Sequence, residues 1–302
     1  MADQPGTGPK PTRALAAALE PFSAQVYFSP ECHKAYEALG FAGSPGKLGE
    51  VHLPDSPAYF CSRGSILGQV PGEVIAAAFG VFNPEVVVPA VRHGWTLTDA
   101  TTIQAARTEG SLAQLRRILG DEPAGLAEAT EFLQRANDRL RPEGRPLYAG
   151  LVSQGLPDDP LGVAWRLADR LREYRGDCHI AAWTSAGFDA TEIGLLTEPY
   201  WGLPMRTYVR TRAWTDEQLD AAEERLKSRG LVKDAALTAE GRSQREAVEA
   251  ATDEACRRIV DNLGDDLEEL VSILGGWSKA IQAAGGYPVS GPHELAQLAK
   301  NR

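Results

Sequence analysis

The stretch TDEQLDAAEERLKSRGLVKDAALTAEGR, residues 215–242, carries the local signals of one complete helix and the start of another. Thr215 and Gln218 have the spacing of a capping box at a helix N-terminus. Gly230 follows the last turn of the amphipathic run and predicts the end of that helix. A brief polar stretch and a second long helix, residues 239–263, are expected to follow.

Two segments of this stretch resemble MarR-type winged-helix regulators. RLKSRGLV (225–232) is similar to the end of their recognition helix, and LTAEGR (237–242) is similar to the run that opens their dimerisation helix. The resemblance covers residues 177–263. It implies a helix-turn-helix with a β-hairpin wing, in a class of proteins that act as homodimers.

The whole chain also resembles an actinobacterial family of helix-turn-helix proteins of similar length. The segments that carry this resemblance are YFSPE (27–31), ILGQVP (66–71), GRPLY (144–148) and YRGDCH (174–179). The resemblance implies a helix-turn-helix fold, and it implies no particular chemistry.

The sequence also contains an internal repeat. ECHKAYEALGF (31–41) matches DCHIAAWTSAGF (177–188), and LGD recurs at 119–121 and 263–265, 144 positions apart. A common order and offset predict duplication of one structural unit. The alternative is that unrelated helical stretches share an Ala-rich composition.

The repeat and the resemblance together predict a mainly α protein with two tandem winged-helix-like repeats that form a single-chain pseudo-dimer. Residues 1–11 are expected to be a flexible tail, residues 12–150 the first repeat, and residues 151–302 the second, MarR-like repeat. Because one chain then imitates a homodimer, we expect a monomer.

The composition fits a soluble, helical protein. The chain has 302 residues, of which 43% are hydrophobic, and its formal net charge is −10. VVVPA (86–90) is the one strand-like run, and Pro89 interrupts it. No stretch is long and apolar enough to cross a membrane. Four cysteines without close pairing suggest reduced thiols, so we expect a cytoplasmic protein.

The charge on the predicted recognition helices weighs against DNA binding. Residues 215–230 hold five acidic and three basic side chains, and the matching segment 71–82 has only Glu73. DNA phosphates need clustered Lys and Arg. A ligand-responsive MarR-like transcription regulator that binds DNA is the alternative, and it requires one exposed basic stripe made of Arg206, Arg210, Arg212, Arg225 and Arg229.

A third alternative is a partner-binding module. The segment PGEVIAAAFGVF (71–82) is mostly apolar. A docking role requires Val74, Ile75 and Phe79 to face solvent, whereas a core helix would bury them.

The polar segment YRGDCH (174–179) has two interpretations. Asp177 suits the N-cap of a helix that starts there, with Gly176 easing the turn. Alternatively, His179 and Asp177 are catalytic acid–base groups, and Arg175 binds a ligand carboxylate or phosphate.

A ligand pocket is expected at the interface of the two repeats, because pockets form between helices and at domain interfaces. Its expected polar contacts are Arg63, Asn83 and Arg175, and its expected apolar walls are Trp183 and Trp201. Trp214, Arg206 and Arg210 are further candidates for an aromatic pocket with a cationic end, and the alternative is that these rings belong to the core. Tyr59 and Gln69 fall, with Arg63 and Asn83, in the corresponding segments of the first half.

Cys32-His33 and Cys178-His179 occupy matching positions, and thiolate and imidazole are zinc ligands. Neighbouring helical residues point about 100° apart, however, so neither pair easily grips one ion. We expect no metal. No nucleotide-binding fingerprint occurs, and no cofactor is expected.

The sequence thus favours a small-molecule-binding protein on a MarR-like scaffold that has lost DNA binding. A cofactor-independent enzyme of specialised metabolism is one form of this hypothesis, and whether the chain is an enzyme stays open.

Overall fold

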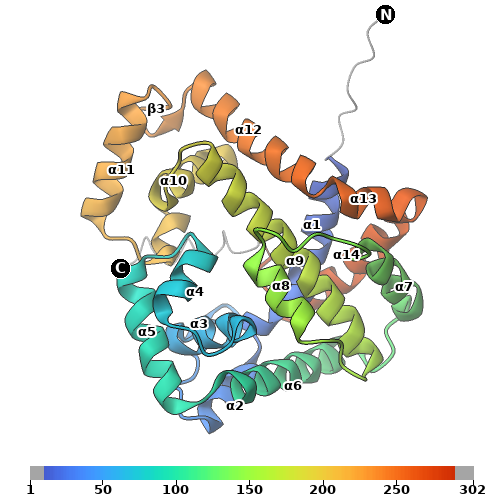
Figure 1. The fold of residues 1–302 in the computed structure, drawn as a ribbon. Helices are drawn as coiled ribbons and strands as arrows, with labels where there is room; N and C mark the ends of the chain where they lie inside the picture. The colour runs from blue at the N-terminus through green and yellow to red at the C-terminus, as the bar shows by residue number, and fades with distance from the viewer. Residues whose placement is uncertain (1–9, 290–302) are drawn as a thin grey trace, which may run out of the picture.

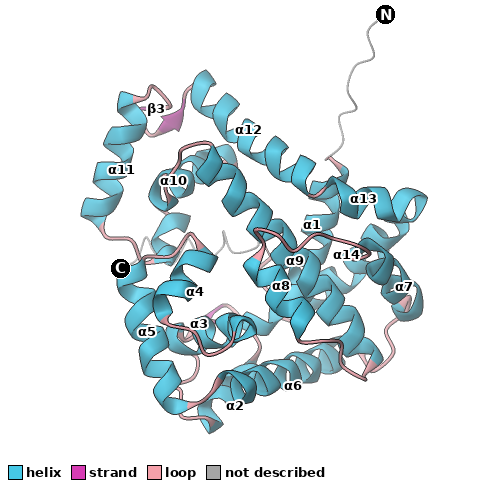
Figure 2. Cartoon of the chain, in the orientation of Figure 1, coloured by secondary structure: helices cyan, strands magenta, loops and turns pink. Residues whose placement is uncertain are grey.

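The structure is a computed structural model that describes residues 10–289, and these residues form a mainly helical protein (Figures 1 and 2). The mainly α class is therefore confirmed. Of the predicted tail, residues 1–11, all but the last two positions lie outside the described residues. None of the described helices combines the length and the apolar character that a membrane span needs.

The elements follow one another along the chain with short connections, and those labelled η are 3-10 helices. Up to residue 153 they are α1 (Pro11–Ala24), η1 (Gln25–Tyr27), α2 (Pro30–Ala38), β1 (Lys47–Leu48), β2 (Val51–His52), α3 (Ser56–Gly64), η2 (Ser65–Leu67), α4 (Gly72–Phe79), α5 (Pro84–Leu97), α6 (Ala100–Leu119), α7 (Leu126–Ala136) and α8 (Pro146–Ser153). The elements after residue 153 are α9 (Pro160–Ser185), α10 (Ala190–Tyr200), η3 (Tyr208–Arg212), α11 (Asp216–Ser228), β3 (Val232–Lys233), β4 (Ala236–Leu237), α12 (Ala239–Ala255), α13 (Arg257–Leu263), η4 (Gly264–Asp266) and α14 (Leu267–Ala283).

Side-chain caps fix where many of these helices begin. Asp99, for example, accepts a hydrogen bond from the backbone N–H of Thr102 at the start of α6. The predicted capping box of Thr215 and Gln218 is confirmed at the start of α11. Gly230 ends that helix with a positive φ, as predicted. Other capping side chains belong to Ser29, Asp55, Asn83, Asp159, Asp189 and Thr238.

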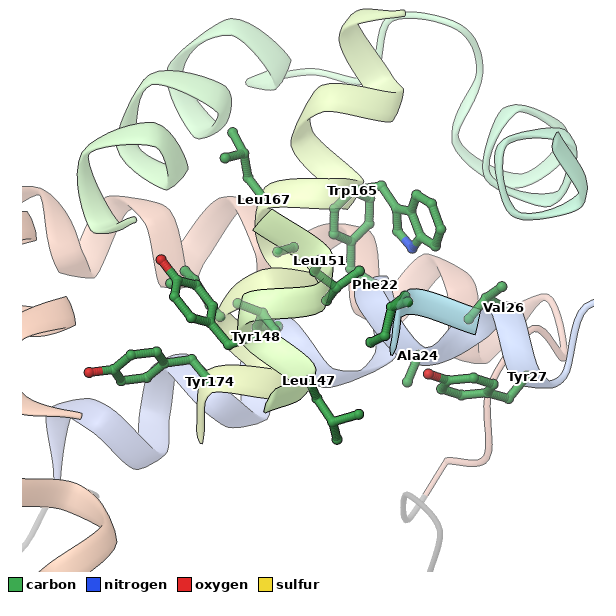
Figure 3. Close-up of a cluster of buried hydrophobic side chains, with 14 of the residues drawn as sticks. Phe22, Ala24, Val26, Tyr27, Leu147, Tyr148, Leu151, Trp165, Leu167 and Tyr174 are labelled. Carbon is green, nitrogen blue, oxygen red and sulfur yellow. The ribbon is translucent and has the colours of Figure 1, made fainter. Parts of the chain in front are cut away.

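Most buried apolar side chains belong to one cluster, which we call the main core. It draws its members from residues 15–178 and 256–287. Helix α9 runs through its middle (Figure 1), and Figure 3 shows Trp165 and Phe22 among the side chains that meet there. The indole Nε1 of Trp165 donates a hydrogen bond to the carbonyl of Ser23 at 3.0 Å. The main core therefore unites the two ends of the described chain with the central helix.

A second and smaller cluster, the module core, draws its members from residues 183–248. Helices α10, α11 and α12 and the antiparallel hairpin β3–β4 supply it. The short hairpin that the MarR-type resemblance implies after α11 is present. Figure 1 shows that α9 leads into this module and that α12 leads out of it.

The structure corrects the expectation that a helix starts at Asp177. Residues 160–185 form the single helix α9, so Asp177 lies in the helix interior. Its Oδ2 accepts a hydrogen bond from the backbone N–H of Tyr148, in the first turn of α8, at 2.9 Å. Asp177 therefore satisfies an otherwise unpaired N–H at the start of a neighbouring helix.

Two further local features differ from what the sequence suggests. The strand-like run VVVPA (86–90), which Pro89 interrupts, lies within helix α5. Val87 and Val91 are fully buried there, and their four-residue spacing places both on one helix face, so packing overrides β-propensity. The expected helix over residues 239–263 is divided at Cys256 into α12 and α13.

The partner-binding alternative lacks the surface that it requires. Ile75 and Phe79 of α4 belong to the main core, and their exposed fractions are 0% and 2%. Only Val74 of the three side chains faces solvent. Helix α4 is therefore a core helix, which was the competing interpretation.

Candidate functional site

A cavity of about 810 Å³ opens between the N-terminal part of the chain and the segment that leads into α11. This volume lies within the range of small-molecule sites. We call it the aromatic cavity because seven aromatic side chains line it. They are Tyr27, Phe28, Tyr59, Phe60, Phe82, Trp214 and Tyr287.

The rings on one side of the aromatic cavity hold one another in place. The ring centroid of Tyr59 lies 5.0 Å from that of Tyr27 and 5.6 Å from that of Phe82. Phe60 meets Phe82 edge to face at 5.2 Å. Such arrangements are favoured by the ring quadrupoles. This wall is therefore formed by side chains that are already packed against each other.

Arginines from η3 make the cationic part of the wall. Arg210 pairs with Asp216 at 2.6 Å, so its charge is neutralised locally. Arg212 has no acidic partner among residues 10–289. Its guanidinium lies over the rings of Phe82, at 4.6 Å, and Tyr208, at 4.7 Å, and it donates a hydrogen bond to the Tyr208 hydroxyl. The cavity thus presents a positioned cation that no carboxylate balances.

Glu198 of α10 binds the backbone of residues 206–209, the stretch that leads into the arginines of η3. Its side chain is fully buried. Oε1 accepts the backbone N–H of Thr207 at 2.9 Å and that of Val209 at 2.7 Å, and Oε2 accepts the N–H of Arg206 at 2.6 Å. Three backbone donors therefore converge on one carboxylate, which fixes η3 against α10.

Asn83 holds the same segment from the other half of the chain. Its backbone N–H donates to the carbonyl of Arg212 at 2.9 Å, and its side-chain amide donates to the carbonyl of Ala213 at 3.0 Å. Close by, Nε1 of Trp214 donates to the carbonyl of Val81 at 2.9 Å. Asn83 was expected to contact a ligand. The structure places it, 2% exposed, where it positions the cavity wall.

Arg63 lies in a buried ion chain behind the aromatic cavity. Its Nε and Nη2 donate to the two oxygens of Glu173 at 2.8 and 2.7 Å. Arg172 bridges Glu173 and Glu20. Burial alone would raise the pKa of Glu173, but the charges of Arg63 and Arg172 lower it to about 2. The guanidinium of Arg63, which was expected to contact a ligand, therefore forms an internal salt bridge with Glu173.

A smaller cavity of about 180 Å³ lies on the other side of this ion chain. Arg172 and Glu20 line both cavities, and Arg63 and Arg175 line the smaller one. Arg175 also pairs with Glu249 of α12 at 2.9 Å. The ion chain therefore forms the partition between the two cavities.

The two predicted tryptophan walls lie away from the aromatic cavity. Trp183 is buried in the module core, and its Nε1 has no partner among the described residues. Trp201 is 52% exposed and packs edge to face on Tyr200. Among the further candidates, the structure does bring Tyr59, Arg210 and Trp214 together at the aromatic cavity.

Asp177 and His179 of α9 face different helices. Nδ1 of His179 lies 3.0 Å from Oγ1 of Thr252. Because that hydroxyl already donates to the carbonyl of Val248, the imidazole is the donor. Burial lowers the pKa of His179 to about 4 and raises that of Asp177 to about 7. The histidine is therefore neutral at physiological pH, and Asp177 is partly protonated.

In the first of the two matching Cys-His pairs, the cysteine and the histidine contact different parts of the backbone. Cys32 contacts the carbonyl of Arg107 through its sulfur, whereas His33 contacts the carbonyl of Tyr27 through Nε2. Within residues 10–289 no group of three or more His, Cys, Asp or Glu side chains could hold a metal ion.

Sequence reasoning missed Glu198 and Arg172. Both are charged residues inside amphipathic helices, where a solvent-facing position is the default expectation. The nearest backbone donor to Glu198 lies eight residues away, and Glu20, which Arg172 links to Glu173, lies 152 residues from Arg172, so no local motif marks them. A buried carboxylate that binds successive backbone N–H groups is recognisable only once the chain is folded.

A comparison with protein families matches residues 12–288 to a helix-turn-helix family. The match spans nearly the whole chain. The chain belongs to this helix-turn-helix family. No curated protein and no solved structure matches it.

In this helix-turn-helix protein, acidic neighbours hold the basic side chains on and before α11. Arg225 pairs with Asp189 at 2.5 Å and with Glu192 at 3.1 Å. Arg206 pairs with Glu223 at 2.6 Å. Further pairs join Arg206 to Asp220, Arg210 to Asp216, Lys227 to Glu223 and Glu224, and Arg229 to Glu192. These contacts balance the charges that a DNA-binding face would need.

Proposed function

We propose that this helix-turn-helix protein binds a small organic anion with an aromatic or otherwise apolar body in the aromatic cavity. The observation that carries this proposal is the guanidinium of Arg212, which lines a cavity of about 810 Å³ without an acidic partner among the described residues. An apolar body would replace water against the rings of Tyr59, Phe60 and Phe82. The acidic group would take the place of the missing carboxylate at Arg212.

Two of the predicted ligand contacts have a supporting role in this proposal. Asn83 and Arg63 are positioning residues: Asn83 holds the backbone of Arg212, and Arg63 fixes Glu173 and through it Arg172. The walls next to the ligand are Tyr59 and Trp214. The proposal needs no metal and no cofactor. A catalytic role for His179 and Asp177 is a separate hypothesis, because neither residue lines this cavity.

Ligand binding can be tested with pairs of aromatic carboxylic acids and their primary amides. We expect the acids to quench tryptophan fluorescence saturably. Arg212→Ala should weaken binding of an acid about 10- to 100-fold, because a hydrogen bond to a charged group contributes about 1.5–3 kcal/mol. Binding of the matching amide should change little. Titration of both ligands against both proteins measures the difference.

Arg257→Ala is the matched control, because Arg257 is a surface cation with an exposed side chain. It should leave the affinity for acids unchanged. If acids and amides bind the wild-type protein equally well, or if Arg212→Ala weakens both alike, the assigned role of Arg212 is wrong. If no member of the panel binds, the proposed cavity function fails.

A DNA-binding regulator is the second candidate, and the family match together with the order α10, α11, hairpin and α12 favours it. The ion pairs on α11 speak against it. Fluorescence anisotropy with pooled genomic DNA fragments at low and moderate salt separates the two functions. We expect no sequence-selective binding at either salt concentration. Selective binding that weakens with salt would establish a regulator and contradict the charge argument.

We also retain the tandem duplication as a proposal. In its favour, a Leu-Thr pair precedes both α6 and α12: Leu237-Thr238 stands directly before α12, and Leu97-Thr98 is separated from α6 by the capping residue Asp99. One difference is that α5 occupies the position between α4 and α6 where the second half has the hairpin β3–β4. A duplication that replaced subunit association predicts a monomer, which light scattering during gel filtration would show.

A further inference from the structure

A groove of about 500 Å³ lies between α9 and α12, and its wall combines a thiol, a carboxyl and a guanidinium. It is bounded by α9, by α12 and by the loop before α8. Cys178, Asp177 and Arg145 line one end, and mostly alanines line the rest. The aromatic cavity shares none of these residues, so any function of this groove is independent of the proposed ligand site.

Arg145 is fixed beside the sulfur of Cys178. Its Nε donates to Sγ of Cys178 at 3.1 Å. Its Nη1 donates to the carbonyls of Arg141 and Glu143, and its guanidinium lies 4.4 Å from the centroid of the Tyr174 ring. These contacts hold the cation in place, so its charge stabilises a thiolate at Cys178.

A second cysteine reaches the same sulfur. Sγ of Cys178 lies 3.9 Å from the carbonyl oxygen of Ala255, the residue before Cys256, and the thiol of Cys256 interacts with that of Cys178. Together with Arg145 and the charge of Arg175, it lowers the pKa of the Cys178 thiol to about 7, against the opposing effect of burial. Cys178 is therefore a thiolate for a substantial fraction of the time at neutral pH, and its neighbour is a protonated thiol.

The other two cysteines have a different environment. All four cysteines are buried, but at Cys32 and Cys61 burial is not offset and raises the pKa of each to about 12. Neither lines the groove, and neither has an arginine donating to its sulfur in the described structure. The features of a reactive thiol are thus concentrated at Cys178.

The carboxyl group of Asp177 also lines the groove and can donate a proton there. Its Oδ2 binds the N–H of Tyr148, whereas its Oδ1 is buried and has no hydrogen-bond partner among the described residues. A carboxyl oxygen in that state is costly as an anion, which agrees with the raised pKa of this side chain. Asp177, which is protonated for part of the time at neutral pH, therefore lines the same groove as the thiolate of Cys178.

The cysteine pair lies at the junction between the two hydrophobic clusters. Cys178 is the last main-core residue of α9 before the module core begins at Trp183. Cys256 lies at the break between α12 and α13, where the chain returns to the main core. A bond between the two sulfurs would link α9, which enters the module, to the junction of α12 and α13, where the chain leaves it.

The geometry points to Cys178 and Cys256 as a redox-active pair that reacts with a hydroperoxide and closes to a disulfide across the base of the winged-helix module. The thiolate of Cys178 attacks the outer oxygen of the hydroperoxide and its O–O bond breaks. Sulfur is oxidised to the sulfenic acid, and the departing alkoxide takes the proton of Asp177. The thiol of Cys256 then attacks the sulfenic sulfur, which forms the S–S bond and releases water.

The first test is oxidation of the full chain with hydrogen peroxide, followed by mass spectrometry of peptides prepared without reductant. We expect a linked pair of peptides that contain Cys178 and Cys256. In Cys256→Ser, dimedone should label a sulfenic acid at Cys178, and in Cys178→Ser no such label should form at Cys256. Oxidation spread equally over Cys32 and Cys61, or absence of the linked peptides from folded protein, would refute the pair.

The second test separates thiolate activation from simple packing. The rate of Cys178 alkylation by iodoacetamide should rise with pH around a midpoint near 7 in the wild-type protein. Arg145→Gln should raise that midpoint and slow alkylation at neutral pH about threefold, after allowing for the greater intrinsic nucleophilicity of a more basic thiol. Arg141→Gln, an exposed neighbour in the same loop, should change neither. An unchanged midpoint in Arg145→Gln would show that Arg145 does not activate the thiol.

Discussion

Replacement of Asp169 by alanine is expected to lower the free energy of unfolding by about 3–5 kcal/mol, since it leaves a buried arginine without its counter-ion. Asp169 of α9 is fully buried, and its Oδ2 accepts from Nη2 of Arg107 at 2.8 Å. Burial alone lowers the pKa of Arg107, but the charge of Asp169 raises it above its ordinary value. Urea unfolding followed by circular dichroism measures the loss.

Two further variants show whether the effect comes from the unpaired charge. The double variant Arg107→Met with Asp169→Leu should recover most of the stability, because removing both charges also removes their desolvation. Arg257→Ala breaks an exposed ion pair and should cost less than about 1 kcal/mol. The guanidinium of Arg107 lies 4.9 Å from the centroid of the Trp165 ring. A double variant as unstable as Asp169→Ala alone would indicate that lost packing against this ring, and not the unpaired charge, causes the loss of stability.

Glu198→Ala is expected to lower the free energy of unfolding by about 3 kcal/mol, because it deprives two buried and one partly buried backbone N–H groups of their acceptor at roughly 1–3 kcal/mol each. These N–H groups belong to Arg206, Thr207 and Val209. The loss should be concentrated in η3, which carries the arginine wall of the aromatic cavity. Hydrogen exchange should therefore accelerate most at the amides of residues 206–209.

The same variant links local order to ligand binding. Loosening η3 should weaken binding of aromatic acids even though Glu198 does not line the aromatic cavity. Glu217→Ala, at an exposed position in the first turn of α11, should change stability by no more than about 0.5 kcal/mol and leave affinity intact. Equal exchange rates in wild type and Glu198→Ala would contradict the assigned role.

Membership of a helix-turn-helix family favours DNA binding, whereas the paired charges on α11 weigh against it. The module retains a helix-turn-helix order with a short hairpin. Its α11 arginine, Arg225, is nonetheless turned toward Asp189 and Glu192 at the start of α10. Basic residues at such positions stabilise the contact between α10 and α11 instead of offering free charge to phosphates. Fold alone is weak evidence for function.

Some local features were predictable from sequence because their causes lie within a few residues. The capping box at Thr215 and the stop at Gly230 depend on neighbouring backbone groups, and both are confirmed. The apolar run of α4 correctly indicated a core helix. The failures have the opposite cause: Asp177 has the character of an N-cap, but the N–H that it binds belongs to Tyr148 on another helix.

The sequence by itself determined the mainly helical class and the two ends of α11, at the capping box of Thr215 and at Gly230, since helix propensity and capping are local properties. Tertiary structure alone decided the sites. It brought Arg212 of one half beside Phe82 of the other, placed Arg145 on the sulfur of Cys178, and buried Glu198 beneath three backbone donors. These juxtapositions depend on how helices far apart in sequence pack, and no periodicity or short motif encodes that packing.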